Sequence, residues 1–162
     1  MNRILKRALL LFCLSLVIIT AASFANAKDR NAENCTANRG VKPDIRISAC
    51  TRVLKKTDTY GDFGDAAAFS NRASAYAQKG DYNRALRDLN EAVSRIALLG
   101  EKIDEDPVGR MIAAGIFGNR GVVNLALQRQ SEATADFEQA LLIEPNILKY
   151  KESVKRLDES DR

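Results

Sequence analysis

The sequence predicts an all-α fold, a short array of stacked helical hairpins closed by a C-terminal capping helix. Three observations support this. Between Ala66 and Asn146 the chain repeats itself at an offset of 48 residues, apolar residues recur at helical spacing, and no stretch shows the alternation of a half-buried strand. Internal repeats of a helical pattern are typical of solenoid proteins, in which each unit packs against its neighbours.

Identical residues occupy corresponding places in the two copies. The identical pairs are Ala66 and Ala114, Phe69 and Phe117, Asn71 and Asn119, Arg72 and Arg120, Ala85 and Ala133, Asp88 and Asp136, and Ala92 and Ala140. Two conservative pairs join them, Ala73 with Gly121 and Leu89 with Phe137. Helices that pack 8–10 Å apart need small side chains where they cross and large ones beside the crossing. Each copy is therefore predicted to be one helical hairpin.

Turn and cap residues set the predicted boundaries. In the first unit, residues 66–99, two helices are expected on either side of Gly80 and Asp81, which suit a left-handed C-cap and an N-cap. In the second unit, residues 107–145, helices are expected from Pro107 to Leu127 and from Ser131 to Ile143. About 14 residues of the second unit, LLGEKIDEDPVGRM, are an insertion expected to lengthen the flanking helices and the loop.

Two further helices flank the repeats. Residues 43–56 begin with a proline suited to a first helical turn and carry an apolar stripe, so they are predicted to form a leading helix. Residues 146–158 are predicted to form the capping helix, and the helical domain therefore spans residues 43–158. The polar residues 28–42 are expected to be flexible and irregular. A loop, TDTYGDFGD, follows the leading helix, and its Asp65 is expected to cap the next one.

The first 27 residues have the layout of a secretory signal peptide. Arg3, Lys6 and Arg7 precede an apolar run over residues 8–22, and the small residues before position 28 fit a cleavage site after Ala27. The run covers 15 positions, whereas a spanning helix takes roughly 20. We therefore expect a periplasmic or secreted protein that is not membrane-bound after cleavage. The mature part has 22 basic and 21 acidic residues, a net charge of +1, which gives no reason to expect nucleic acid as a partner.

Cys35 and Cys50 remain after cleavage, and an even pair in an exported chain favours a structural disulfide. A redox-active pair is the alternative, but such pairs usually have C-x-x-C spacing. No histidine is present anywhere in the chain, so the commonest general base is missing. We expect no catalytic residues, no metal and no cofactor. The acidic cluster of Glu101, Asp104, Glu105 and Asp106 does not have calcium-loop spacing, and Asp106 is expected to cap the helix after Pro107.

The repeated residues resemble the tetratricopeptide repeat (TPR), a helical hairpin of about 34 residues with small residues at the crossing. In the first unit the resemblance is carried by Phe69, Ala73, Tyr76, Tyr82, Ala85, Leu89 and Ala92, and in the second by Phe117, Gly121, Ala133, Phe137, Ala140 and Pro145. The second unit departs from the first where Asn124 replaces Tyr76 and Gln130 replaces Tyr82. The start of the chain is also similar to small secreted bacterial TPR proteins.

The resemblance implies a protein-interaction module rather than an enzyme. In TPR proteins the first helix of each unit lines a concave groove, so the candidate peptide-binding residues are Asn71, Asn119, Ser70, Ser74, Gln78 and Val122, with Gly118 and Leu125 on the same surface. The lysines with which some TPR modules clamp a C-terminal carboxylate are missing, because Ala67, Ser70 and Gly115 stand at those places. For the two asparagines, bracing of the fold is an equal alternative.

Arg72 and Asp88, and Arg120 and Asp136, are candidate ion pairs. Both pairs have a spacing of 16, which places their members opposite each other in an antiparallel hairpin. A structural role in hairpin register is favoured over an arginine that grips a ligand carboxylate. The function predicted overall is the binding of an unidentified protein or peptide. Two alternatives stay open at this point: an accessory subunit or unrecognised hydrolase of the cell envelope, and a self-associating, homo-oligomeric unit.

Overall fold

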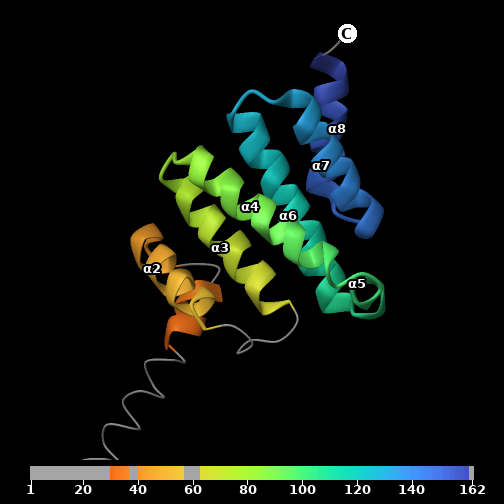
Figure 1. Ribbon diagram of the computed structural model, residues 1–162. Helices are drawn as coiled ribbons and strands as arrows, with labels where there is room; N and C mark the ends of the chain where they lie inside the picture. Colours follow the sequence, from red (N-terminus) through yellow and green to blue (C-terminus); the bar gives the residue numbers. More distant parts are fainter. Residues whose placement is uncertain (1–29, 37–39, 57–62, 161–162) are drawn as a thin grey trace, which may run out of the picture.

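The computed structural model describes residues 30–36, 40–56 and 63–160, and all regular structure in these ranges is helical. A helix of residues 30–36 is followed by α2 (Pro43–Leu54), α3 (Gly64–Gln78), α4 (Tyr82–Ala97), α5 (Lys102–Glu105), α6 (Pro107–Ala126), α7 (Gln130–Ile143) and α8 (Leu148–Ser160). The prediction of an all-α hairpin array is confirmed. Figure 1 shows the helices stacked side by side from the orange α2 to the blue α8.

The array consists of two antiparallel hairpins with a helix on each side. α3 packs against α4, and α6 packs against α7. The first helix of the second hairpin, α6, contacts both helices of the first. At the two ends, α2 covers α3 and α8 covers α7. Because each hairpin leaves an apolar side that only its neighbour covers, these contacts bury one continuous set of small and large side chains.

Small residues stand at the helix crossings, as their spacing predicts. Ala73 and Ala85 are fully buried between α3 and α4, next to the fully buried Leu89. In the second hairpin, Gly121 takes the place of Ala73 and the larger Phe137 takes the place of Leu89. A Cβ atom on Gly121 would lie 2.7 Å from the Phe137 ring. The larger ring is therefore accommodated only because the facing residue has no side chain.

The turns of the two hairpins differ in their caps. In the first, Gly80 has a φ of 75°, and the Asp81 side chain accepts a hydrogen bond of 3.1 Å from the Arg84 N–H. This N–H is the main cause that lowers the pKa of the Asp81 carboxyl, and the side-chain hydrogen bond from Arg84 acts in the same direction. In the second turn Gln128 adopts a φ of 59°, and Arg129, the residue before α7, gives no side-chain cap.

The insertion lengthens the second hairpin and adds the short helix α5. Asp106 accepts a hydrogen bond of 2.9 Å from the Val108 N–H, so it caps α6. α6 then runs for 20 residues, and its first turn extends past the start of α3. There Phe63 lies against Gly109, where a Cβ atom would come within 2.4 Å of the ring. Phe63 thus has the packing role expected of an aromatic next to this loop.

Two local predictions are wrong. Residues 30–36 are helical rather than irregular, because the buried Cys35 anchors them against α2. Asp65 does not cap α3, since that helix already begins at Gly64 after Phe63. The predicted signal peptide of residues 1–27, and most of the loop before α3, lie outside the described residues. Within the described part, no helix has both the length and the apolar character needed to cross a membrane.

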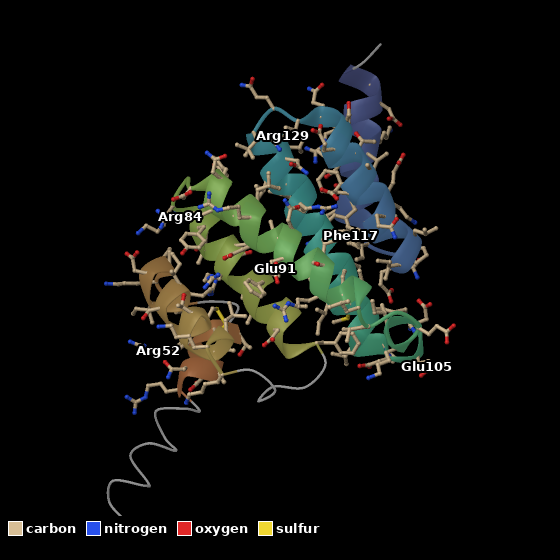
Figure 2. The ribbon with its side chains drawn as sticks, in the orientation of Figure 1. Arg52, Arg84, Glu91, Glu105, Phe117 and Arg129 are labelled. Atoms are coloured by element: carbon tan, nitrogen blue, oxygen red, sulfur yellow. A yellow bond between two sulfur atoms is a disulfide. The ribbon has the colours of Figure 1, made fainter. Side chains whose placement is uncertain are left out.

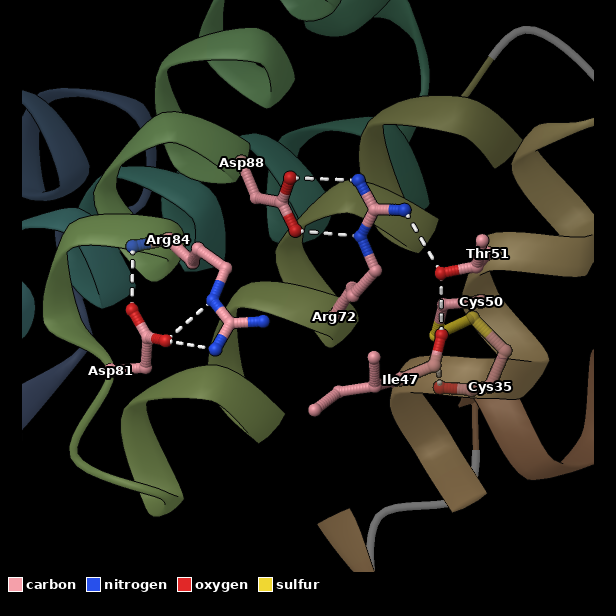
Figure 3. A network of polar contacts seen from close by, with 8 residues as sticks. All are labelled: Cys35, Ile47, Cys50, Thr51, Arg72, Asp81, Arg84 and Asp88. Carbon is pink, nitrogen blue, oxygen red and sulfur yellow. Dashed lines mark hydrogen bonds and ion pairs between the residues drawn. A yellow bond between two sulfur atoms is a disulfide. The ribbon is translucent and has the colours of Figure 1, made fainter. Parts of the chain in front are cut away.

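A disulfide joins the N-terminal helix to α2. Cys35 and Cys50 are bonded, and both are buried with Ala49, Val53 and Ala68 in a small cluster between this segment and α3. Figure 3 shows the yellow disulfide beside Thr51, whose hydroxyl donates to the Ile47 carbonyl and accepts a hydrogen bond of 3.0 Å from Arg72. The disulfide-linked segment is therefore connected to the first hairpin through Arg72.

The structure brings both predicted ion pairs together. Arg72 donates two hydrogen bonds to Asp88, Nε to Oδ2 at 2.7 Å and Nη2 to Oδ1 at 2.8 Å (Figure 3). These hydrogen bonds are the main cause that raises the pKa of the Arg72 guanidinium. In the second hairpin Arg120 contacts Asp136 at 2.7 Å, and the Asp136 side chain is only 4% exposed. Bidentate pairs of this kind fix geometry as well as adding energy.

We expect Asp88→Ala to reduce the free energy of unfolding by about 3 kcal/mol, because it leaves the Arg72 guanidinium partly buried without its carboxylate. Urea denaturation followed by circular dichroism measures this loss. Asp158→Ala, on the exposed surface of α8, is the matched control and should change the value by less than about 0.5 kcal/mol. An unchanged midpoint for Asp88→Ala would mean that the pair contributes nothing to the fold.

Removal of the disulfide is expected to reduce stability by about 3 kcal/mol, since it closes a loop of 15 residues. The double variant Cys35→Ser/Cys50→Ser should melt earlier than the oxidised protein and should be unaffected by dithiothreitol. The oxidised protein should approach the same melting temperature once it has been unfolded with reductant. Equal melting curves for all samples would contradict this role.

Candidate functional site

A cavity of about 290 Å³ opens between the first helices of the two hairpins. It is lined by Ser74, Ala77, Gln78, Leu89, Asn119, Val122 and Val123. We call it the α3/α6 groove. Its floor is apolar, since Leu89 and Val123 are buried core residues. Its edges carry two amide side chains and one hydroxyl. A site of this composition suits an apolar side chain next to a peptide backbone.

Asn119 is held at the edge of the groove by the neighbouring helix. Its amide nitrogen donates a hydrogen bond of 3.1 Å to the Ser70 hydroxyl. A carboxamide has two N–H groups and a carbonyl oxygen, so this contact leaves hydrogen-bonding capacity for a ligand. The hydrogen bond crosses from α6 to α3 and therefore both braces the stack and orients the amide. The two roles that the sequence left open for Asn119 are compatible.

The structure divides the predicted binding residues into two groups. Ser74, Gln78, Asn119 and Val122 line the groove together. Asn71 is half-buried one turn before Ser74 on α3 and is not part of the lining. Val122 is 55% exposed, an unusual exposure for a valine in the middle of a long helix.

Three predicted residues do not face the groove. Ser70 is only 6% exposed and receives the Asn119 amide, so it orients the site rather than lining it. Gly118 lies under the Tyr150 ring of α8, where a Cβ atom would come within 2.0 Å of it. Leu125 packs in the cluster between α7 and α8. The last two predictions are wrong because α8 covers this part of α6, which a repeat pattern alone does not reveal.

Leu89, Ala77 and Val123 line the groove but were not among the predicted site residues. Leu89 belongs to the second helix of its hairpin and reaches the groove as its floor. In sequence it has the signal of a core residue, and it is one. Only the position of α6 across α3 and α4 makes its surface part of a cavity.

The groove has no charged residue in its lining. Farther along the same helices stand Ala67 and Gly115, and no atom lies within 4 Å of a Cβ atom built on Gly115. An acidic ligand would therefore gain no ion pair from the lining. Among the described residues, no three metal-ligating side chains are grouped as a metal site requires.

Residues 66–97, which form α3 and α4, match the family model of the tetratricopeptide repeat. The curated relative, tetratricopeptide repeat protein 36 of Xenopus tropicalis, is 29% identical over 109 residues. The match covers 65% of this chain and 54% of that protein, so the chain spans about half the length of the relative.

Solved TPR domains share the fold over most of the chain. The first TPR of Spaghetti (RPAP3) bound to the HSP90 peptide SRMEEVD has a TM-score of 0.57 and 25% identity, and the match covers 74% of this chain and 79% of that one. The second TPR domain of human RPAP3 in complex with the HSP70 peptide SGPTIEEVD has a TM-score of 0.54 and 26% identity, covering 72% and 82%.

The Arabidopsis OM64 TPR domain shares the fold with a TM-score of 0.63 at 24% identity, over 83% of this chain and 97% of that one. Its likeness concerns the arrangement of helices alone. The repeat match over α3 and α4, together with the fold shared with these domains, supports the assignment of this protein to the tetratricopeptide-repeat family.

Proposed function

We propose that this protein is a protein-interaction module that holds an uncharged segment of a partner protein in the α3/α6 groove. The observation that carries the proposal is the groove itself, with an apolar floor and an Asn119 amide fixed by Ser70. Two similar TPR domains are bound to peptides from chaperones, which supports a peptide as the kind of ligand.

The partner segment is proposed to bind through its backbone and one apolar side chain. The Asn119 and Gln78 amides supply donors and acceptors for a peptide backbone. Val122, Val123 and Leu89 supply the apolar surface beside them. Because no charge lines the groove, the peptides ending in EEVD that the two similar domains bind are not the proposed ligands here.

Panning of a random peptide display library against the full chain should select peptides with an apolar residue flanked by uncharged ones. Their affinity should change little between about 50 and 500 mM salt, since exposed charges do not drive binding. Asn119→Ala should weaken binding by up to about tenfold, the worth of one hydrogen bond. Val122→Asp should weaken it further by placing a charge beside the apolar floor.

Asn83→Ala, at an exposed position of α4, is the matched control and should leave binding unchanged. The peptide SRMEEVD serves as the comparison ligand and should bind more weakly than the selected peptides. Selection of acidic peptides whose affinity falls steeply with salt would contradict an uncharged ligand. Equal binding by the wild type and Val122→Asp would contradict the groove as the site.

We also propose that the protein acts outside the cytoplasm. The apolar run and cleavage pattern of residues 1–27 support export, and so does a buried disulfide, because such bonds persist in oxidising compartments. Expression in a bacterial host should yield a protein whose intact mass corresponds to a chain that begins at Lys28, with Cys35 and Cys50 oxidised. A product that keeps Met1, or that carries free thiols, would argue against export.

A further inference from the structure

A second cavity, of about 320 Å³, lies away from the groove between the second helices of the two hairpins. It is lined by Leu86, Asn90, Arg120, Asn124, Arg129, Glu132, Ala135 and Asp136. We call it the α4/α7 cavity. It opens at the turn between α6 and α7, where Figure 2 labels Arg129. Nothing in the proposed peptide-binding role uses it.

The first hairpin fills the corresponding space with its own side chains. The offset of 48 residues relates Asn124 to Tyr76 and Glu132 to Arg84. In the first hairpin the Arg84 guanidinium lies 4.8 Å from the centroid of the Tyr76 ring, and Arg84 also pairs with Asp81. The second hairpin has neither the aromatic ring nor the arginine. The cavity is therefore the space from which an aromatic side chain is missing.

The floor of the cavity is already fixed. Asn124 is 4% exposed, and its amide nitrogen donates a hydrogen bond of 2.8 Å to Asp136. Arg120 holds the same carboxylate and also donates to Asn90 at 3.2 Å. Exchange of a tyrosine for a buried asparagine thus leaves a rigid polar floor rather than a collapsed core, and a rigid site loses little freedom on binding.

The charges around the cavity favour a neutral ligand. Two arginines and two carboxylates line it, so an anionic ligand meets Glu132 and Asp136, and a cationic ligand meets Arg120 and Arg129. Leu86 and Ala135 supply apolar surface for a ring. The exposed Arg129 lies at the mouth, where a guanidinium stacks well on an aromatic face, and Glu132 offers an acceptor for a hydroxyl.

We propose that the α4/α7 cavity receives the phenol side chain of a tyrosine from a partner protein. The inserted ring takes the place that Tyr76 has in the first hairpin, with Arg129 over its face and Glu132 accepting the hydroxyl proton. The occupant is a side chain that enters from outside, because Asn90, Arg129, Glu132 and Ala135 are all exposed at the surface. This surface is separate from the α3/α6 groove and adds a second contact for a partner.

The test uses N-acetyltyrosinamide as the probe, titrated into the isotopically labelled full chain and followed by NMR. We expect saturable shifts at the amides of Asn90 and Ala135, with a dissociation constant on the order of millimolar. N-acetylphenylalaninamide lacks the hydroxyl and should bind about 2–10-fold more weakly. Equal binding of the two probes, or no saturable shift with either, would overturn the proposal.

Two variants locate the site. Asn124→Tyr supplies the ring from within and should abolish binding of the probe. Ala135→Phe obstructs the cavity from an exposed position, so it tests the site even where Asn124→Tyr does not fold. Ser94→Phe, at an exposed position of α4 outside the lining, and the groove variant Val122→Asp should both bind the probe as the wild type does. Undiminished binding by Ala135→Phe would show that the probe binds elsewhere.

Discussion

The packing of aromatic rings against the glycines of α6 is the constraint on which the array depends. Phe63 lies on Gly109, Tyr150 on Gly118 and Phe137 on Gly121, and a Cβ atom at each glycine would come within 3.0 Å of the ring. Through these contacts one helix receives the start of α3, the partner helix α7 and the capping helix α8. Tyr150 also stacks on Phe137 at 5.7 Å, so the cap is attached to the core of the second hairpin. Glycine lowers helix propensity, and close packing offsets that cost.

Polar contacts add register to this packing. Each hairpin has one arginine–aspartate pair across its crossing, and each arginine reaches one element further, Arg72 to Thr51 and Arg120 to Asn90. The ion pairs thus connect neighbouring units as well as the two helices of one hairpin. Such pairs contribute modestly to net stability, but a slip in register leaves a charge unpaired. The Asn119–Ser70 hydrogen bond adds a further link between the units, next to the groove.

The two hairpins have the same crossing but different surfaces, and the differences coincide with the proposed sites. In the first, Tyr76, Asp81 and Arg84 complete the turn and fill the space beside it. In the second, Asn124 and Arg129 leave the α4/α7 cavity open. On the other side of the stack, the α3/α6 groove needs both hairpins, since its floor and edges come from α3, α4 and α6. A repeat array thus produces different sites from similar units, because substitutions outside the crossing are tolerated by the fold.

The sequence by itself determined the helical class, the two hairpins, their caps at Asp81 and Asp106 and the pairing of Arg72 with Asp88, because these follow from local periodicity and from spacing within one hairpin. Only the tertiary structure decided that residues 30–36 are helical, that Gly118 and Leu125 lie under α8, and that Leu89 forms the floor of the groove. It also gave Asn124 its meaning, since a substitution seen in sequence becomes a cavity only between α4, α6 and α7. The physical reason is that exposure depends on which helix covers which, and contacts between distant elements leave no periodic signal in the chain.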